Sequence, residues 1–261
     1  MAAGNNWTKT QLRQAFYLYC QLPFGRLHSR TPEIVQLAAQ IDRTPSAVAM
    51  KLVNLASLDP AIRLSGRAGL GNASALDKAV WDEFHLDWDS SVLAVNEIEF
   101  AIEASKDSIK KIELTEDIDY TGVSTSVSVM QRKKQSFFRK AVLNSYQSRC
   151  CMSGVTEPKL LIASHIVPWR ADEKNRLNPS NGLCLSVIHD KAFDQGLIGL
   201  SDSLSIVVSS RLKKSKDSFT ISNLLALEGQ QIQLPERFAP DMSFIQWHRV
   251  NLFDKTTTAK D

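Results

Sequence analysis

Residues 160–196 read LLIASHIVPWRADEKNRLNPSNGLCLSVIHDKAFDQG, and this stretch decides the fold. The apolar run from Leu160 to Ala163 predicts a short strand, which Pro168 brings to an end. Asn181-Gly182 is a strong turn signal, and apolar residues alternate along the positions that follow it. The pattern therefore predicts a strand, a loop, a turn and a second strand.

A short helix is expected directly after the second strand. The segment from His189 to Phe193 has helical spacing, and Gly196 is placed to end the helix. Two of the chain's five histidines, His165 and His189, lie in this stretch. Folded in this order, the elements would bring both histidines to one small site.

The order His165, Asn181, His189 resembles the HNH nucleases, which share the ββα-metal fold. The resemblance is closest to a branch with the pattern SHI-P-W, NGL-L and H---FD-G, which is common among restriction-like and phage-defence endonucleases. A His-Asn-His order alone is weak evidence, but further positions of the branch also match. These are Ile166, Pro168, Trp169, Gly182, Leu183, Phe193, Asp194 and Gly196.

The resemblance implies that His165, Asn181 and His189 are catalytic. His165 would be the general base, a task suited to a side chain with a pKa near neutrality. Backbone contacts from the loop, together with Asn181, would hold its ring in the useful tautomer. Alternatively, Asn181 only shapes the hairpin. His189 would bind a divalent metal ion at the start of the helix.

The second protein ligand of the metal ion has several candidates. In related sites the residue before the base histidine is often Asp or His and also binds metal, but here it is Ser164, whose neutral hydroxyl is a poor ligand. Asp194 is the expected substitute or a residue that orients a ligand, with Asp190 behind it. Alternatively, Asp194 caps the backbone of the turn. Oxygen and imidazole ligands suit Mg²⁺ or Mn²⁺ and are compatible with other first-row ions.

Basic residues are the candidates for contacts with DNA phosphates. Arg170 and Lys191 flank the expected site and could position the scissile phosphate. Residues 121–149 include no acidic side chain, and a second basic cluster lies at 211–216. The alternative interpretation of both clusters is a solvated basic face. The candidates from the first cluster are Lys133, Lys134 and Arg139.

The N-terminal third predicts a series of helices, at residues 7–22, from Thr31-Pro32 onward, from Thr44-Pro45 onward, and at 75–86. The second and third are joined tightly and are similar to a helix-turn-helix, whose second helix reads DNA bases. The alternative is a plain helical bundle that holds the nuclease or a partner. The DNA-contacting candidates are Arg43, Ser46, Lys51 and Asn54, the last three facing outward.

The predicted fold class is α+β, with a helix-turn-helix-like domain at residues 1–90 and a ββα-metal HNH nuclease domain at 129–253. Residues 91–128 are expected to form an acidic connector that ends in a flexible linker, because 121–128 are small and polar. The strong helix that opens the nuclease domain is expected at 131–147. Residues 254–261 are expected to be a disordered tail.

Length and composition limit which classes of protein this chain can belong to. The chain has 261 residues, 43% of them hydrophobic, which is enough for a sizeable core. No apolar run approaches the roughly 18 residues of a membrane span, and no secretory signal is evident. The four cysteines do not resemble a disulfide framework or a zinc knuckle, so reduced thiols in the cytoplasm are expected.

The sequence therefore predicts a cytoplasmic, metal-dependent endonuclease of restriction or phage-defence type that acts on double-stranded DNA. A homodimer is expected, because one ββα-metal site cuts one strand. Two alternatives stay open. One is a DNA-binding protein with a decayed nuclease site, which Ser164 favours. The other is an effector gated by a nucleotide or a partner subunit. Because the chain has no Gly-rich phosphate loop, such a gate is expected from another chain.

Overall fold

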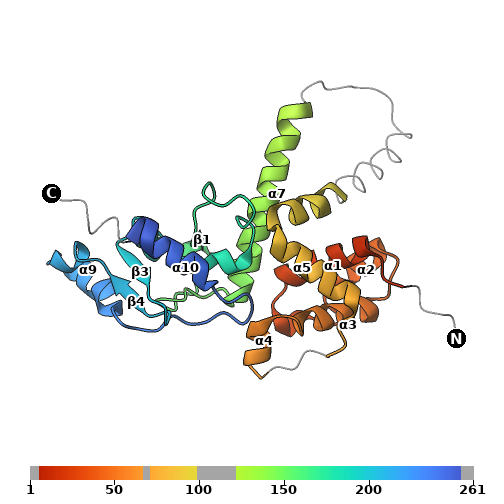
Figure 1. Ribbon diagram of the computed structural model, residues 1–261, viewed down its shortest axis with the longest axis horizontal. Helices are drawn as coiled ribbons and strands as arrows, with labels where there is room; N and C mark the ends of the chain where they lie inside the picture. Colours follow the sequence, from red (N-terminus) through yellow and green to blue (C-terminus); the bar gives the residue numbers. More distant parts are fainter. Residues whose placement is uncertain (1–5, 67–70, 99–121, 254–261) are drawn as a thin grey trace.

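The computed structural model describes residues 6–66, 71–98 and 122–253 of the chain. It is α+β, with a helical N-terminal region and short strands in the C-terminal half. Figure 1 shows the long helix α7 (Gly122–Ser145) between these two parts, with the N-terminal helices on one side and strands β3 (Ile198–Leu200) and β4 (Ile206–Val208) on the other.

The N-terminal helices begin at residues that can cap them. The Thr8 hydroxyl accepts a hydrogen bond from the backbone of Gln11, Thr44 caps α3 in the same way, and Ser74 forms a capping box with Asp77 at α5. The helices expected from the sequence are confirmed. They are α1 (Lys9–Gln21), α2 (Pro32–Gln40), α3 (Pro45–Ala56) and α5 (Ala75–Leu86), with η1 (Phe24–Arg26) and α4 (Pro60–Leu64) between them.

A further helix over residues 88–98 crosses the boundary predicted at residue 90. Trp88, Val92 and Val95 are fully buried along one face of it, so it belongs to the core of the helical region. The prediction that residue 91 opens a connector is therefore wrong, because an apolar stripe continues past it. The rest of the predicted connector, residues 99–121, lies outside the described residues, as does the predicted tail at 254–261.

The helix α7 runs from Gly122 to Ser145 and carries the basic segment. Residues 122–128, predicted as a flexible linker, are helical here, which corrects that prediction. No proline and no glycine follow Gly122 in this segment. A helix that is already stabilised by packing at Phe137, Phe138 and Val142 can therefore extend through it.

The C-terminal half is built on the hairpin that the sequence predicted. Strand β1 (Leu161–His165) pairs antiparallel with β2 (Gly182–Ser186), with Leu161 opposite Ser186 and His165 opposite Gly182. The turn η2 (Pro158–Leu160) precedes β1, η3 (Pro179–Asn181) precedes β2, and α8 (Val187–Asp194) follows it. Gly196 has a φ of 63° just beyond α8, a backbone conformation suited to glycine at the end of a helix.

The helix α7 packs on one face of this hairpin, where Gly182 leaves room for it. A Cβ atom at Gly182 would overlap Val142 Cγ2 and lie 3.1 Å from Phe138 Cζ. The ring of His165, opposite Gly182 in the register, stacks on Phe138 of the same helix. His165 and Gly182 therefore face α7, and by the alternation of strands Ser164 and Leu183 face the other way.

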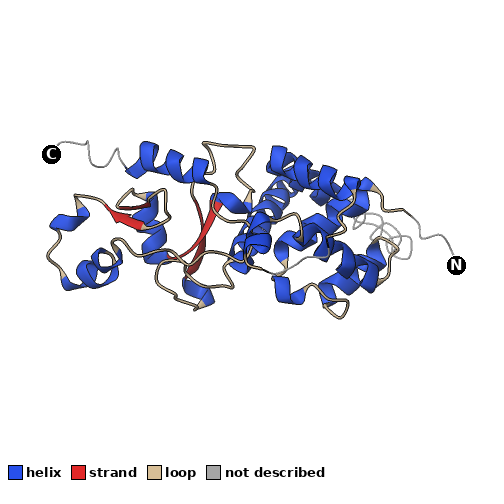
Figure 2. Cartoon of the chain, turned by 60° about the horizontal axis from the view of Figure 1, so that its bottom comes forward, coloured by secondary structure: helices blue, strands red, loops and turns tan. Residues whose placement is uncertain are grey.

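The remaining elements form a small second layer, which Figure 2 shows beside the hairpin. Strands β3 and β4 follow Gly196 and pair antiparallel. The elements are β3 (Ile198–Leu200), β4 (Ile206–Val208), η4 (Leu212–Lys214), α9 (Ser218–Asn223), η5 (Leu225–Leu227), α10 (Met242–His248) and η6 (Arg249–Phe253).

The C-terminal half also inserts into the helical region. The fully buried Arg237 donates to the backbone oxygen of Tyr19 in α1, and the backbone N–H of Phe238 donates to Asp59 over 3.2 Å. The two parts therefore share one hydrophobic core. Within residues 6–66, 71–98 and 122–253, no helix combines the length and the apolar character that crossing a membrane requires.

Candidate active site

His165, the predicted general base, ends strand β1 with its ring held on three sides. Its Nε2 donates to the backbone oxygen of Arg176 over 2.8 Å. The ring stacks on Phe138 with centroids 3.9 Å apart, and Trp169 meets it edge-on at 5.5 Å. Because a carbonyl oxygen only accepts, the proton is assigned to Nε2, and Nδ1 keeps its lone pair.

Burial lowers the pKa of His165 below its usual 6.5, and the Arg176 carbonyl only partly opposes that shift. The ring is therefore neutral near pH 7. It is also accessible, because His165 lines an open hollow of about 310 Å³ together with Ile162, Arg139 and Trp169. A neutral, oriented imidazole beside an accessible hollow can take a proton from a water molecule.

Asn181 is fully buried and holds the loop that follows β1. Its Oδ1 accepts from Val167 N over 2.8 Å, and its Nδ2 donates to the oxygens of Val167 (3.1 Å) and Asn175 (3.3 Å). Asn175 directly precedes Arg176, whose carbonyl orients His165. This geometry supports the structural alternative for Asn181, since its amide contacts the loop backbone rather than the His165 ring.

Asp89, which the sequence analysis did not single out, holds the same loop from outside. It accepts hydrogen bonds from Arg176 Nε and Nη2, both 2.7 Å long, and from Lys134 Nζ of α7. Partial burial on its own would raise the pKa of Asp89. The hydrogen bonds and positive charges of Arg176 and Lys134 have a larger effect, and the pKa of Asp89 is lowered. The backbone N–H groups of Trp88 and Asp89 also donate to Lys174 O. No local sequence signal marks Asp89, because its partners lie far along the chain.

His189 lies at the opposite end of the hairpin from His165. Its Nδ1 is 2.7 Å from Ser186 Oγ and 3.7 Å from Cys150 Sγ, and its Nε2 is 3.2 Å from Asn223 O. Ser186 and Gly182 mark the two ends of β2, about 13 Å apart. The expectation that the two histidines meet in one site is therefore wrong, because the register separates them.

The ring nitrogens of His189 are both within hydrogen-bonding distance of protein groups. A metal ligand needs a nitrogen with a free lone pair, so this geometry does not support the predicted metal role of His189. The ring instead favours the thiolate form of Cys150. Burial opposes ionisation of Cys150, but hydrogen bonds from His189 and Ser153 outweigh it and lower the pKa of Cys150 to about 6.

Ser164 faces α8, where its hydroxyl lies beside the carboxyl group of Asp190. Burial raises the pKa of Asp190, and the nearby Ser164 hydroxyl and Lys191 ammonium oppose that shift. Asp194, one turn further along α8, has a pKa raised to about 6 by partial burial and by the Asp190 charge. The buried Ser164 Oγ makes no hydrogen bond of ordinary geometry with the described residues.

These three side chains fit a hard divalent cation. Two adjacent carboxylates whose charges repel each other, with an unsatisfied hydroxyl beside them, offer the oxygen ligands that Mg²⁺ and Mn²⁺ prefer. In the part of the chain that the structure describes, no group of three or more His, Cys, Asp or Glu side chains forms a metal site. A cation here would therefore rest on Asp190 and Asp194, with Ser164 and water completing its coordination.

The basic residues predicted near the site differ in their surroundings. Arg170 and Lys191 are exposed. Arg139 donates to the backbone oxygen of Leu161 over 2.9 Å and so anchors the start of β1, while Lys134 pairs with Asp89. Lys133 lines a separate cleft between α7 and the N-terminal helices.

Of the residues predicted to face DNA from the N-terminal helices, only Ser46 is exposed. Arg43 lies over the Trp7 ring and donates to Gln11 Oε1 over 3.0 Å. Lys51 pairs with the buried Asp77 at 2.9 Å, and Asn54 is only 8% exposed. The prediction that Lys51 and Asn54 face outward is wrong, because that face of α3 packs against α5.

His248 is buried and stacks on Phe193 with centroids 3.7 Å apart. Its Nε2 donates to the backbone oxygen of Phe193, and burial lowers the pKa of His248 to about 4. All four cysteines are buried, and none of them is in a disulfide bond in this structure.

Residues 150–201 match the model of a family described as HNH endonuclease. No curated protein matches the chain. The matched segment holds the hairpin, α8 and β3, and therefore His165, Ser164 and the two carboxylates of α8. The match supports an HNH endonuclease domain in this segment, and such a domain suggests nuclease activity on DNA.

Proposed function

We propose that this chain is a metal-dependent endonuclease that hydrolyses phosphodiester bonds in double-stranded DNA. One observation carries the proposal. In the segment that matches the HNH family, His165 is neutral, oriented through Nε2 by the Arg176 carbonyl, and one of the residues that line an open hollow.

The reaction needs a water molecule to lose a proton as it attacks phosphorus. His165 Nδ1 accepts that proton, while the Nε2 hydrogen bond to Arg176 stabilises the resulting imidazolium. Phe138 and Trp169 keep the ring in place during this transfer. Asn181 and Asp89 act on the loop that carries Arg176, and so position the base without touching the substrate.

Asp190 and Asp194, with Ser164, would hold a divalent cation, Mg²⁺ or Mn²⁺. When bound, such an ion relieves charge on the phosphoryl oxygens and assists the leaving 3′ oxygen. Lys191 lies close enough to influence both carboxylates and, with the exposed Arg170, is placed to contact phosphates beside the site.

A restriction or phage-defence role is proposed from the resemblance of the motif to that branch of nucleases. The N-terminal helices would then recognise the DNA, with Ser46 the exposed residue at the start of α3. A homodimer would supply two sites for the two strands.

A DNA-binding protein with a decayed or partner-gated site is the second candidate. Ser164 favours it, because a hydroxyl is a weaker cation ligand than a carboxylate. Supercoiled plasmid incubated with the protein in Mg²⁺, Mn²⁺ or EDTA separates the two. We expect metal-dependent conversion to open-circle or linear DNA. Binding of the plasmid without conversion in any metal would favour the second candidate.

A further inference from the structure

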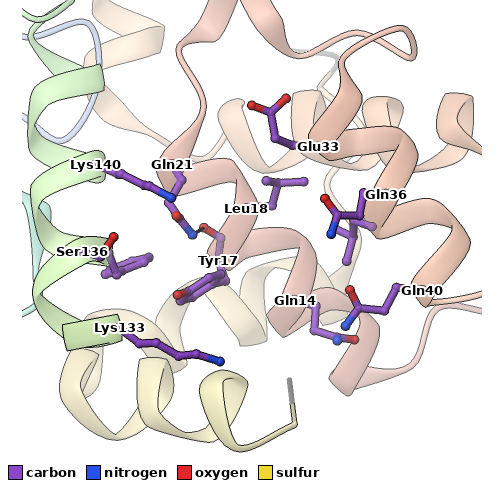
Figure 3. A pocket seen from close by; sticks show the side chains of 12 residues that line it. Gln14, Tyr17, Leu18, Gln21, Glu33, Gln36, Gln40, Lys133, Ser136 and Lys140 are labelled. Atoms are coloured by element: carbon purple, nitrogen blue, oxygen red, sulfur yellow. Dashed lines mark hydrogen bonds between the residues drawn. The ribbon is translucent and has the colours of Figure 1, made fainter. Parts of the chain in front are cut away.

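Basic side chains also line hollows that lie apart from His165. One hollow lies between α1, α2 and α7, where Figure 3 shows Lys133 and Lys140 on the α7 wall, and the acidic Glu33 lines it as well. Another, of about 550 Å³, opens between the end of α8 and η4, and none of the described residues that line it is acidic. Of the two, the hollow at η4 therefore favours an anionic partner more strongly.

The hollow at η4 begins one residue beyond a proposed cation ligand. Its lining comes from the end of α8 and from the segment around η4, and consists of Gln195, Leu197, Arg211, Leu212, Lys214 and Ser215. Gln195 directly follows Asp194 in the chain. The backbone N–H of Ser209 donates to the oxygen of Leu197 over 2.9 Å, which fixes the segment before η4 against the end of α8. The hollow is therefore built onto the helix that carries the two proposed cation ligands.

Two cations of this hollow are available to a partner. Arg211 and Lys214 are exposed, and neither forms an ion pair with the residues that the structure describes. Lys213, which lies between them in the chain, differs in both respects. Its Nζ pairs with Glu228 over 3.2 Å, and its side chain is not part of the lining. Neighbouring positions of one basic cluster therefore divide into two cations that face the hollow and one that is already neutralised.

The rest of the lining suits the sugar–phosphate backbone of DNA. Leu197 and Leu212 are half-buried and supply apolar walls on which a deoxyribose ring can pack. The exposed Gln195 amide can donate to a phosphate oxygen. None of the described residues in the lining is aromatic, so an unstacked base would find no ring to stack on. The lining therefore favours the backbone of a strand over its bases.

We propose that the hollow between α8 and η4 binds the backbone of the DNA duplex, with Arg211 and Lys214 on a phosphate beyond the cleavage position. The inference rests on the proposed function, since it assigns a DNA-binding surface to the same site. Arg211 and Lys214 are not among the charges that shift the pKa of Asp194, which are those of Asp190 and Lys191. The two cations therefore hold a phosphate other than the scissile one, and they position the duplex on α8.

The salt dependence of DNA binding by the full chain tests the proposal. Affinity for a fluorescein-labelled duplex is measured by anisotropy in EDTA at several salt concentrations, and each phosphate contact contributes about 0.9 to the slope of log affinity against log salt. We expect Arg211→Gln and Lys214→Gln each to reduce this slope by about one and to weaken binding roughly fivefold at about 0.1 M salt. The loss should be the same for two duplexes of unrelated sequence, because a phosphate contact does not distinguish bases.

Lys213→Gln is the matched control, because it removes the same charge from the position between the two variants. Lys213 is paired with Glu228 and does not line the hollow, so this change should leave the slope and the affinity nearly unchanged. All three variants should melt at the wild-type temperature, since the three side chains are exposed. A loss of affinity in Arg211→Gln or Lys214→Gln would then not reflect a loss of folded protein.

Three results would overturn the proposal. They are no binding of the duplex by the wild type, slopes unchanged in both Arg211→Gln and Lys214→Gln, and a loss in Lys213→Gln as large as theirs. Either of the last two would indicate a solvated basic face. Plasmid cleavage in Mn²⁺, measured on the same proteins, tests the proposed function separately. A wild type that binds without cutting, with reduced slopes in the two variants, would support this surface and contradict the nuclease. A wild type that cuts, with unchanged slopes in the variants, would do the reverse.

Discussion

The Asp89 carboxylate accepts two hydrogen bonds from the Arg176 guanidinium, each 2.7 Å long. The backbone oxygen of the same Arg176 accepts the Nε2–H of His165 over 2.8 Å. A residue of the helix at 88–98, in the helical region, therefore orients the candidate base in the HNH-like segment. Lys134 joins the same carboxylate from α7, whose Phe138 packs on the His165 ring.

Asp89→Asn is expected to slow DNA cleavage by roughly tenfold to a hundredfold, because loss of the charge loosens Arg176 and the His165 ring with it. The pH dependence of the rate should shift as well, since the His165 Nε2 partner becomes mobile. Asp202→Asn, which removes the exposed partner of Arg249, is the matched control and should change neither. A slower enzyme with an unchanged pH profile would show that Asp89 only stabilises the fold.

The pH dependence of cleavage follows from the lowered pKa of His165. Burial disfavours the imidazolium, so the folded pKa lies below 6.5, and the ring is neutral above that value. We expect the rate to be maintained through pH 7 and to fall as the pH drops below 6.5. Rates should be measured at saturating Mn²⁺ at each pH, because Asp194 also takes up a proton near pH 6. An acid limb centred above 6.5 would argue against His165 as the base.

Metal binding is expected to depend on α8 rather than on His189. Asp190→Asn and Asp194→Asn should each weaken Mn²⁺ binding by about tenfold or more in calorimetry, since each removes one of two carboxylates. Asp82→Asn, at an exposed position of α5, is the control. His189→Ala should retain Mn²⁺ binding while lowering thermal stability. Binding that is lost in His189→Ala and kept in both Asp variants would move the metal to His189.

Gly182→Ala is expected to destabilise the chain by about 1–3 kcal/mol, because a methyl group there collides with Val142 of α7. Gly25→Ala is the matched control. A Cβ atom at Gly25 would meet nothing within 4 Å, so the change should stay within about 0.5 kcal/mol. Urea unfolding of the two variants measures the difference. Equal stability would mean that α7 does not pack closely on the hairpin.

The elements that the sequence predicted correctly are those with local signals. Each of these signals spans only a few residues: the apolar run that precedes Pro168, the Asn181-Gly182 turn, and Gly196 at the end of the helix. The hairpin and α8 follow from them. The N-terminal helices were predictable for the same reason, because Thr8, Thr44 and Ser74 mark their starts.

The arrangement of side chains could not be predicted from local signals. Asp89 and Arg176 are 87 positions apart, and no pattern in either segment announces the contact. The motif marks His189 but not the direction of its ring, which depends on the pairing of Leu161 with Ser186. The spacing of Asp190 and Asp194 on α8 did carry a signal, because residues four apart lie on one helix face. That spacing indicates a metal site only together with the orientation of Ser164 toward α8, which local signals do not give.

The most direct test compares cleavage and binding of DNA by His165→Ala, with His28→Ala at an exposed position outside the site as control. Nicking of supercoiled plasmid is measured in Mn²⁺, and affinity for a duplex is measured by fluorescence anisotropy in EDTA. We expect His165→Ala to lose at least about a hundredfold in rate while its affinity for the duplex stays within about twofold, and His28→Ala to match the wild type. A His165→Ala protein that cuts at the wild-type rate would contradict this expectation.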